Sequence, residues 1–494
     1  MVRRGVKAAR LEPEAPTSNG SNNQLCSKSQ LALFDQFYAI QDCIVRKEQL
    51  LFDPVTVLQA GQQTIEFVLP PVTDACYDLA ALTLRLKVQL MNGSEPVKKC
   101  RTDVEGEHET AYDPVALSCG ALQSMFRQCE LLINDQPTTP AQLNHHYRAY
   151  ITNLLNYTAN AKGILLASSG FSTMDIGDPG SVDFNRNYAL AGRARFTEKG
   201  ATYHLEGRLA HDLFAMTKYL PPNVKITIRL QRTSDQFCLL TERNNADYNI
   251  KVSFWFAFFC ANFYTPFHSQ ITDAKICCLR VQLAEHTVRY IERTIATRPA
   301  VYNFLRTEVR RFTVPAQVSQ WSIANAWSGE VPIQTVIAMV DAEAYAGSYK
   351  TNGFNFQPFG LTVLTQKVDN VAFGPEYRQS SWTDQSGMMY AYVQTLKALR
   401  VFNGNRQLDI SLDSFKNGCT LFAFDNSPDT SYNSPCRSGT VTYDLTFATN
   451  LSRAITVIVY GIFYGTLFIE GSQAVTVTER VQHTLHESGG PLPF

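Results

Sequence analysis

Three segments of the chain alternate apolar and polar residues without a break, and this pattern constrains the fold more than any other feature. The segments are LTLRLKVQL (82–90), VKITIRLQ (224–231) and VTYDLTFA (441–448). Successive side chains of a strand point to opposite faces of its sheet, so each segment predicts a strand with one buried face and one face in water. Turn-rich segments separate such stretches along the chain. The sequence therefore predicts a fold dominated by antiparallel β-sandwiches.

One amphipathic stretch occurs twice, as YRAYITNLL (147–155) and MYAYVQTLK (389–397). Four weaker matches accompany it: FVLP (67–70) with FTVP (312–315), LFAM (213–216) with LFAF (421–424), the alternating strand from Val224 with that from Val441, and an apolar strand from Ile250 with residues near Ala454. The matches keep one order in both halves. They predict two diverged copies of one sandwich of about 200 residues each, the first with an extra loop near 169–204.

Helices are few in this pattern. Residues 139–157 have Thr139 as a candidate N-cap and Pro140 at the first helical position, followed by apolar residues at helical spacing that begin with Leu143. Residues 384–399 repeat that spacing, and residues 284–299 end at a proline in the middle of the chain. We expect the last of these to be a helical connector between the two copies.

Charge is balanced, with 44 basic and 44 acidic residues among 494. A dedicated nucleic-acid binder usually carries a basic excess, so the composition disfavours that class. The first ten residues, in contrast, contain Arg3, Arg4, Lys7 and Arg10 and no acid. On a flexible polar arm these four side chains would contact phosphates weakly and without sequence preference, or serve nuclear import or solubility.

The first ten residues lack the apolar core of a signal peptide, so we do not expect secretion. The longest apolar run, Ile455–Ile469, is interrupted by glycines and is rich in β-branched and aromatic residues, which favours a buried strand over a membrane span. The 12 cysteines contain no CxxC pair. We expect reduced thiols.

A search for chemistry finds no phosphate-binding loop, nucleophile elbow or zinc-protease motif. Three weaker candidates are the pair His145-His146, the stretch HDLF (211–214) and the acidic loop DVEGEHET (103–110). Adjacent histidines on a helix point about 100° apart and make a poor metal site. For all three we favour packing or an exposed loop, and we predict no catalytic residue, no metal site and no cofactor.

Several stretches together resemble the major capsid proteins of Polinton/Maverick elements and adintoviruses, part of the double jelly-roll lineage that includes adenovirus hexon. The stretches are TIEFVLPPVTDACYDLAALTLRLKVQL (64–90), LQSMFRQCELLINDQPTTPAQLNHHYRAYITNLLNY (122–157), GRLAHDLFAMTKYLPPNVKITIRLQRTSDQFCLL (207–240), FTVPAQVSQWSIANAWSGEVPIQTVIAMVDAEAYAGSYKTNGFNFQPFGL (312–361) and KNGCTLFAFDNSPD (416–429). Two departures stand out: TNGFNF (351–356) replaces an Asn-Pro-Phe-Asn-Phe-like run, and the aromatic segment 253–268 is inserted.

The resemblance implies two tandem eight-stranded antiparallel jelly rolls with a few short helices in the loops. The expected parts are a basic and polar arm (1–49), a first jelly roll (50–282), a helical connector (283–305), a second jelly roll (306–472) and a tail (473–494).

The resemblance also implies a function: a structural protein of the virion whose homotrimers, pseudo-hexagonal in outline, tile an icosahedral shell around a DNA genome. The implied partners are neighbouring capsomers, a penton protein at the five-fold vertices and minor or cement proteins, with assembly in the nucleus or cytoplasm of a host cell. Two alternatives remain open. One is a ligand- or glycan-binding sandwich protein. The other is a cupin-like or glycan-processing enzyme, for which the cupin ligand spacing is absent.

Overall fold

The computed structural model divides the chain into two units, Met1–Cys43 and Ile44–Phe494, and all elements named below belong to the second. The structure describes residues 41–56, 63–100, 112–139, 143–171, 180–243, 248–252, 273–379, 385–402, 408, 410–427, 437–471 and 474–478.

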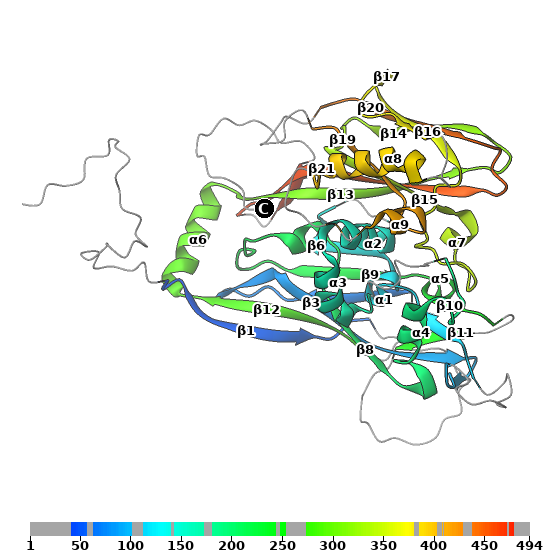
Figure 1. Cartoon of the computed structure of the whole chain (residues 1–494). Helices are drawn as coiled ribbons and strands as arrows, with labels where there is room; N and C mark the ends of the chain where they lie inside the picture. The colour runs from blue at the N-terminus through cyan, green and yellow to red at the C-terminus, as the bar shows by residue number, and fades with distance from the viewer. Residues whose placement is uncertain are drawn as a thin grey trace, which may run out of the picture. The chain divides into compact units, whose positions relative to one another are not determined.

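The first sandwich pairs two antiparallel sheets (Figure 1). One sheet has the order β1 (Ile44–Phe52), β12 (Ala274–Leu283), β3 (Ala75–Asn92) and β11 (Tyr248–Val252), with β4 (Glu95–Pro96) and β8 (Tyr203–Gly207) also paired to β3. The other has the order β2 (Thr64–Leu69), β9 (Ile226–Arg232), β6 (Phe126–Ile133) and β7 (Gln136–Pro137). A separate short pair joins β5 (Val115–Leu117) to β10 (Leu239–Thr241).

The second sandwich repeats this plan. One sheet has the order β13 (Ala300–Val314), β21 (Ile455–Ile469), β15 (Gln334–Asp341) and β19 (Leu421–Asp425), with β22 (Val475–Thr478) paired to β21. The other has the order β14 (Gln320–Ser328), β20 (Thr440–Phe447), β16 (Leu361–Val368) and β17 (Val371–Ala372), with β18 (Tyr377–Arg378) paired to β16. In the second half the long strands β13, β14, β15, β16, β19, β20 and β21 alternate between the two sheets along the chain, as in a jelly roll.

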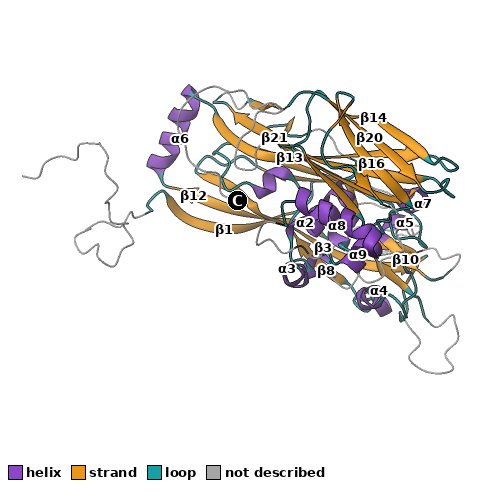
Figure 2. Cartoon of the chain, turned by 45° about the horizontal axis from the view of Figure 1, so that its top comes forward, coloured by secondary structure: helices purple, strands orange, loops and turns teal. Residues whose placement is uncertain are grey.

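Helices are short and lie outside the sheets (Figure 2). The α-helices are α1 (Ala121–Ser124), α2 (His145–Asn156), α3 (Ala159–Leu165), α4 (Tyr188–Ala194), α5 (Asp235–Cys238), α6 (Glu285–Thr297), α7 (Ala342–Ala346), α8 (Gln385–Ala398) and α9 (Leu412–Lys416). The 3-10 turns are η2 (Ala167–Ser169), η4 (Glu198–Gly200) and η5 (Asp212–Ala215). No described helix is long and apolar enough to cross a membrane.

The strand predictions from alternation are confirmed. The residues of β20 alternate strictly between partly and fully buried, and Leu82, Leu84, Leu86, Val88 and Leu90 of β3 all face the core. The predicted buried strand at Ile455–Ile469 is β21, with the same two ends. None of the nine described cysteines forms a disulfide bond.

Three domain boundaries differ from the observed elements. Strand β1 begins at Ile44, inside the predicted arm, because its backbone pairs with β12 and Glu48 forms an ion pair with Arg280 at 2.5 Å. The charged residues of β1 interrupt the apolar-polar alternation, so the sequence did not predict this strand. Strand β13 begins at Ala300, inside the predicted connector, and β22 lies inside the predicted tail. The connector helix itself is present as α6.

The predicted start of the first helix was wrong. Helix α2 begins at His145 with Asn144 in the N-cap position, and Pro140 lies outside the described residues. Thr139 lies five residues before this N-cap position, and its hydroxyl is 3.3 Å from His211 Nε2. Leu143, predicted on the apolar face, is 59% exposed and precedes the helix.

The internal repeat is present, although not all of its sequence matches coincide with it. Helix α2 follows the β6–β7 pair and α8 follows strands paired to β16, while β9 and β20 occupy the same central place in their sheets. The first Leu-Phe stretch of the repeat forms η5, which lies beside β3. Its match in the second half lies in β19, which pairs with β15. Two matches were wrong: FVLP is in β2 but FTVP ends β13, and Ile250 is in β11 whereas β12 is the counterpart of β21.

Candidate functional site at the junction of the two sandwiches

Aromatic rings from both halves of the chain pack together around helix α2. Tyr147 is fully buried, and its ring stacks on that of Tyr345 with centroids 5.4 Å apart and planes 5° apart. Tyr150 stacks on Phe354 with centroids 4.3 Å apart. Tyr345 lies in α7 and Phe354 in the loop before β16, so both belong to the second sandwich. Stacked and edge-to-face aromatic pairs contribute beyond their buried area, so this cluster fastens one sandwich to the other.

Hydrogen bonds cross the same boundary and fix its register. The Asn144 amide donates to the Val309 carbonyl of β13 at 3.2 Å, and the Tyr345 hydroxyl donates to Asn144 Oδ1 at 2.6 Å. The hydroxyls of Thr152 and Tyr460 (β21) lie 3.1 Å apart. Because these groups are largely removed from water, leaving one without its partner costs more than the bond itself contributes.

A buried ion pair adds a charged contact to the junction. Arg148 Nη2 of α2 lies 2.5 Å from Asp212 Oδ1 of η5, and both side chains are almost fully buried. The same carboxylate oxygen accepts a hydrogen bond from the Thr307 amide of β13 at 3.1 Å. Burial raises the pKa of Asp212, while Arg148 and Thr307 act to lower it. The pair therefore links α2, η5 and β13, elements of both sandwiches.

Three buried histidines lie on α2 or at the N-cap position of η5. Burial, with a smaller contribution from nearby Arg148, lowers the pKa of His145 to about 3, and burial lowers that of His146 to about 3. The pKa of His211 is lowered well below its usual value for the same reasons. His145 Nε2 lies 2.9 Å from Gln123 Oε1, and the His146 ring packs edge-on against Phe237 at 4.5 Å. The imidazoles are therefore neutral at pH 7 and serve packing.

The sequence-predicted candidates fall into two groups. His145, His146 and the HDLF stretch (211–214) are brought together at the junction, and packing is the role predicted for them. Arg3, Arg4, Lys7 and Arg10 lie outside the described residues, as do the acidic loop at 103–110 and the aromatic segment at 253–268.

Sequence reasoning missed Asn144, Tyr345 and Phe354 as partners of α2. All three occur in stretches quoted for the capsid resemblance, and that coincidence was the available signal. No local pattern, however, brings a helix near residue 150 into contact with a loop near residue 354. The tyrosines and histidines of the assembled site are buried and neutral, and they hold the two sandwiches together by packing.

Comparison with known proteins starts from the sequence. No protein-family model matches the chain. An uncharacterized protein of Caenorhabditis elegans is 22% identical over 315 residues, which cover 62% of this chain and 67% of the nematode protein.

Solved structures match far more of the chain. A chain of the Sputnik virophage superposes with a TM-score of 0.59 at 10% identity, covering 95% of this chain and 97% of its own length. The mavirus major capsid protein gives a TM-score of 0.50 at 12% identity over 98% of this chain and 100% of its own. The Faustovirus major capsid protein gives 0.51 at 10% identity over 88% and 92%. At such low identity the likeness concerns the fold, and the chain has the double jelly-roll fold of viral major capsid proteins.

Proposed function

We propose that the chain is a major capsid protein, a structural protein without enzymatic activity, which forms homotrimeric capsomers of pseudo-hexagonal outline. The observation that carries this proposal is the extent of the structural match, which includes both sandwiches and nearly the full length of each capsid protein compared. A fold alone does not fix a function. Here the matched feature is more specific than one jelly roll, because two are joined in tandem at comparable length.

The junction supports a trimer on geometric grounds. Within one chain, the helix side of the first sandwich meets the β13–β21 side of the second, so two similar modules touch through different surfaces. Such a contact is heterologous, and repeating it from module to module generates a ring when the rotation closes. A ring of six modules needs three chains of two sandwiches each. Eight strands in each jelly roll, the count implied by the resemblance, belong to the same proposal.

The shell and its partners follow from the capsid family that the sequence resembles. Trimers would tile an icosahedral shell around DNA, with a penton protein at the five-fold vertices and minor or cement proteins between capsomers. We assign the chain to the Polinton and adintovirus lineage and to the virion. Arg3, Arg4, Lys7 and Arg10 would face the genome as an electrostatic, sequence-independent contact.

Solution mass tests the proposal most directly. Light scattering should give about 166 kDa, three times the 55.4 kDa chain, and negative-stain images should show hexagonal outlines or closed shells. A chain that stays monomeric over a wide concentration range would overturn the capsid proposal. Hits on a glycan array by such a monomer would favour the ligand-binding alternative.

The arm has its own test. Deleting residues 1–30 should lower the DNA content of assembled particles, and the effect should weaken as salt rises because counterion release drives such contacts. Unchanged assembly and unchanged DNA content would remove the arm from the proposal and leave the trimer untouched.

A further inference from the structure

Strand β13 is the edge strand of its sheet, and the first sandwich covers only part of that edge. Its pairing with β21 has no register shift, so the backbone groups of alternate residues point away from β21. The Thr307 amide donates to Asp212 Oδ1 at 3.1 Å, and the Val309 carbonyl accepts from the Asn144 side chain at 3.2 Å. The odd-numbered residues of β13 therefore direct their backbone groups to the edge.

The same edge is open at Val301, Asn303 and Leu305, here named the β13 edge. Among the described residues, none is hydrogen-bonded to the backbone groups that these three residues direct to the edge. All three residues are exposed, Val301 to 41% and Leu305 to 53%. An exposed strand edge with apolar side chains is a template on which a further strand can pair.

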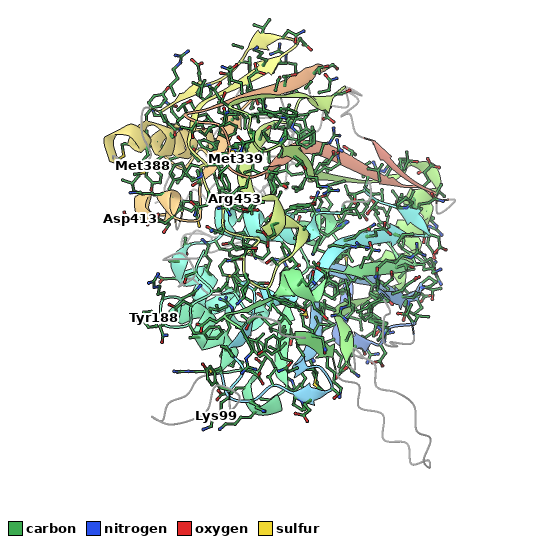
Figure 3. All side chains as sticks on the ribbon, turned by 90° about the vertical axis from the view of Figure 1, so that its right-hand side faces the viewer. Lys99, Tyr188, Met339, Met388, Asp413 and Arg453 are labelled. Atoms are coloured by element: carbon green, nitrogen blue, oxygen red, sulfur yellow. The ribbon has the colours of Figure 1, made fainter. Side chains whose placement is uncertain are left out.

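The opposite edge of this sheet shows how the fold protects such a template. Strand β19 lies at that end of the sheet, and helix α8 packs on it (Figure 3, where Met388 marks the helix). The Thr395 hydroxyl of α8 donates to the Leu421 carbonyl of β19 at 2.9 Å. In the described part of the chain, the β13 edge has no comparable cover. A segment outside the described residues is therefore needed to close it.

The last described strand brings the C-terminal segment, residues 479–494, close to this edge. Thr478 of β22 lies opposite Thr466 of β21, and Thr466 lies opposite Asn303. Neighbouring strands are about 4.8 Å apart, so residue 478 is about 10 Å from β13. The turn into β22 is packed against α6, because a Cβ added at Gly471 would lie 2.9 Å from a carbonyl oxygen of that helix. The starting point of the C-terminal segment is therefore fixed.

The end of the C-terminal segment has a sequence suited to an edge. Residues 491–494 read Pro-Leu-Pro-Phe, so Leu492 and Phe494 share one face when the backbone is extended. Their two amides also point to the same side, where they can pair with a neighbouring strand. The prolines occupy the alternate positions, and a strand tolerates proline where its missing amide would face solvent. Such a segment can pair on one side and offers few donors on the other.

We propose that residues 491–494 add to the β13 edge of their own chain as a short strand. Leu492 and Phe494 then pair with the backbone of β13, and their side chains cover the exposed apolar ones. The 12 connecting residues, 479–490, reach up to about 40 Å when extended, whereas three strand spacings amount to about 15 Å. Gly489 and Gly490 allow the connection to turn. The contact lies within one chain, so the inference does not depend on the proposed trimer.

Residue-resolved hydrogen exchange tests the pairing. The three amides of the β13 edge should exchange slowly in the full chain. Deleting residues 491–494 should accelerate their exchange by on the order of 10-fold or more, because each loses its partner. The amides of Tyr302 and Phe304 point to β21 and are the internal reference, which should keep its rates. Deletion of residues 1–30 is the matched control and should change neither set.

Each outcome decides the inference. Edge amides that exchange rapidly in the full chain, or at the same rate after the deletion, would overturn it. If the shortened chain does not fold, a photo-crosslinking residue at position 305 of the otherwise full chain takes the place of the deletion. In a mixture of light and heavy isotope-labelled chains, crosslinks should join it to residues 491–494 of the same chain. Crosslinks to another copy, or none to these residues, would contradict the assignment. A monomer with a protected β13 edge would overturn the trimer alone.

Discussion

The ring of Tyr147 lies parallel to the ring of Tyr345 at 5.4 Å, although 198 residues separate them and they belong to different sandwiches. The Tyr345 hydroxyl also binds the side chain of Asn144, the N-cap residue of the helix that carries Tyr147. Tyr345 thus contacts both the first turn of α2 and the N-cap residue that precedes it. A rigid junction of this kind is what a two-module building block needs if each module is to meet its neighbours at a fixed angle.

Removing the Tyr147 ring should therefore destabilise the whole chain. Tyr147→Ala leaves a cavity among Tyr345, Phe354 and Phe237, and the expected cost in free energy of unfolding is about 3–5 kcal/mol. Chemical denaturation measures it. Tyr290→Ala on α6, where the side chain is 65% exposed, is the control and should change stability by less than about 0.5 kcal/mol. Equal effects of the two substitutions would contradict a central role for the junction.

The buried ion pair should reveal itself in a double-mutant cycle. Arg148→Met leaves the Asp212 carboxylate buried without its partner, and Asp212→Leu does the same to the guanidinium. Each single change should therefore lower the free energy of unfolding by about 3–5 kcal/mol. The double variant removes both charges and should cost clearly less than the sum. Unfolding free energies of the four proteins give the coupling. Strict additivity would mean that the two groups do not depend on each other.

Lowering the pH should reduce the free energy of unfolding through the buried histidines of the junction. The pKa values of His145 and His146 are lowered to about 3 in the folded state, so between about pH 6.5 and 3 the unfolded chain binds more protons than the folded one. Stability is therefore complete above pH 6.5 and falls with decreasing pH, by about 1.4 kcal/mol per pH unit for each histidine. His211 adds in the same direction, while the raised pKa of Asp212 opposes it in part.

His146→Phe isolates one of these contributions. It replaces a buried imidazole that packs against Phe237 with an apolar ring, and the slope of unfolding free energy against pH should decrease by about 1.4 kcal/mol per unit below pH 6.5. Val371→Phe at an exposed position of β17 provides the control, since it adds an apolar ring without removing a titratable group and should keep the wild-type slope. A wild-type slope in His146→Phe would mean that this imidazole is not held neutral by the fold.

Sequence alone predicted the elements whose signal is local. The strand around Leu82–Leu90, strand β21 and helix α8 have periodicities that a single segment defines. Strand β1 was missed because its stability comes from pairing with β12 more than two hundred residues away, while three consecutive charged residues interrupt its apolar pattern. The order of the repeat was readable, but four-residue similarities such as FVLP and FTVP fell on non-equivalent strands, since short apolar strings recur in any β-protein.

The junction could be predicted only in part for the same reason. The apolar pair Leu213-Phe214 was enough to predict that the HDLF stretch is buried. The ion pair between Asp212 and Arg148 could not be predicted, because an arginine on an amphipathic helix is expected to face solvent. A contact across the two halves depends on how whole modules dock, and no periodicity encodes it.

Gly353 offers the sharpest test of how closely the two sandwiches fit. It lies in TNGFNF (351–356) of the second half, and a Cβ added there would overlap the Phe237 ring of α5 in the first half, with the ring Cζ only 2.9 Å away. The Ala344 carbonyl, 3.1 Å away, closes the other side. Gly353→Ala should therefore cost about 1–3 kcal/mol through overpacking, measured by denaturant titration.

Two further variants complete that test. Gly192→Ala on α4 is the matched control, because nothing lies within 4 Å of its added Cβ and alanine favours a helix, so stability should stay equal or rise by up to about 1 kcal/mol. Shortening the opposing side chain with Phe237→Leu should recover part of the loss in the Gly353→Ala background, although the same change alone destabilises. Recovery identifies the contact between the sandwiches as the cause. If Gly353→Ala proves as harmless as the control, the loop and α5 do not pack this closely, and the junction is looser than these distances require.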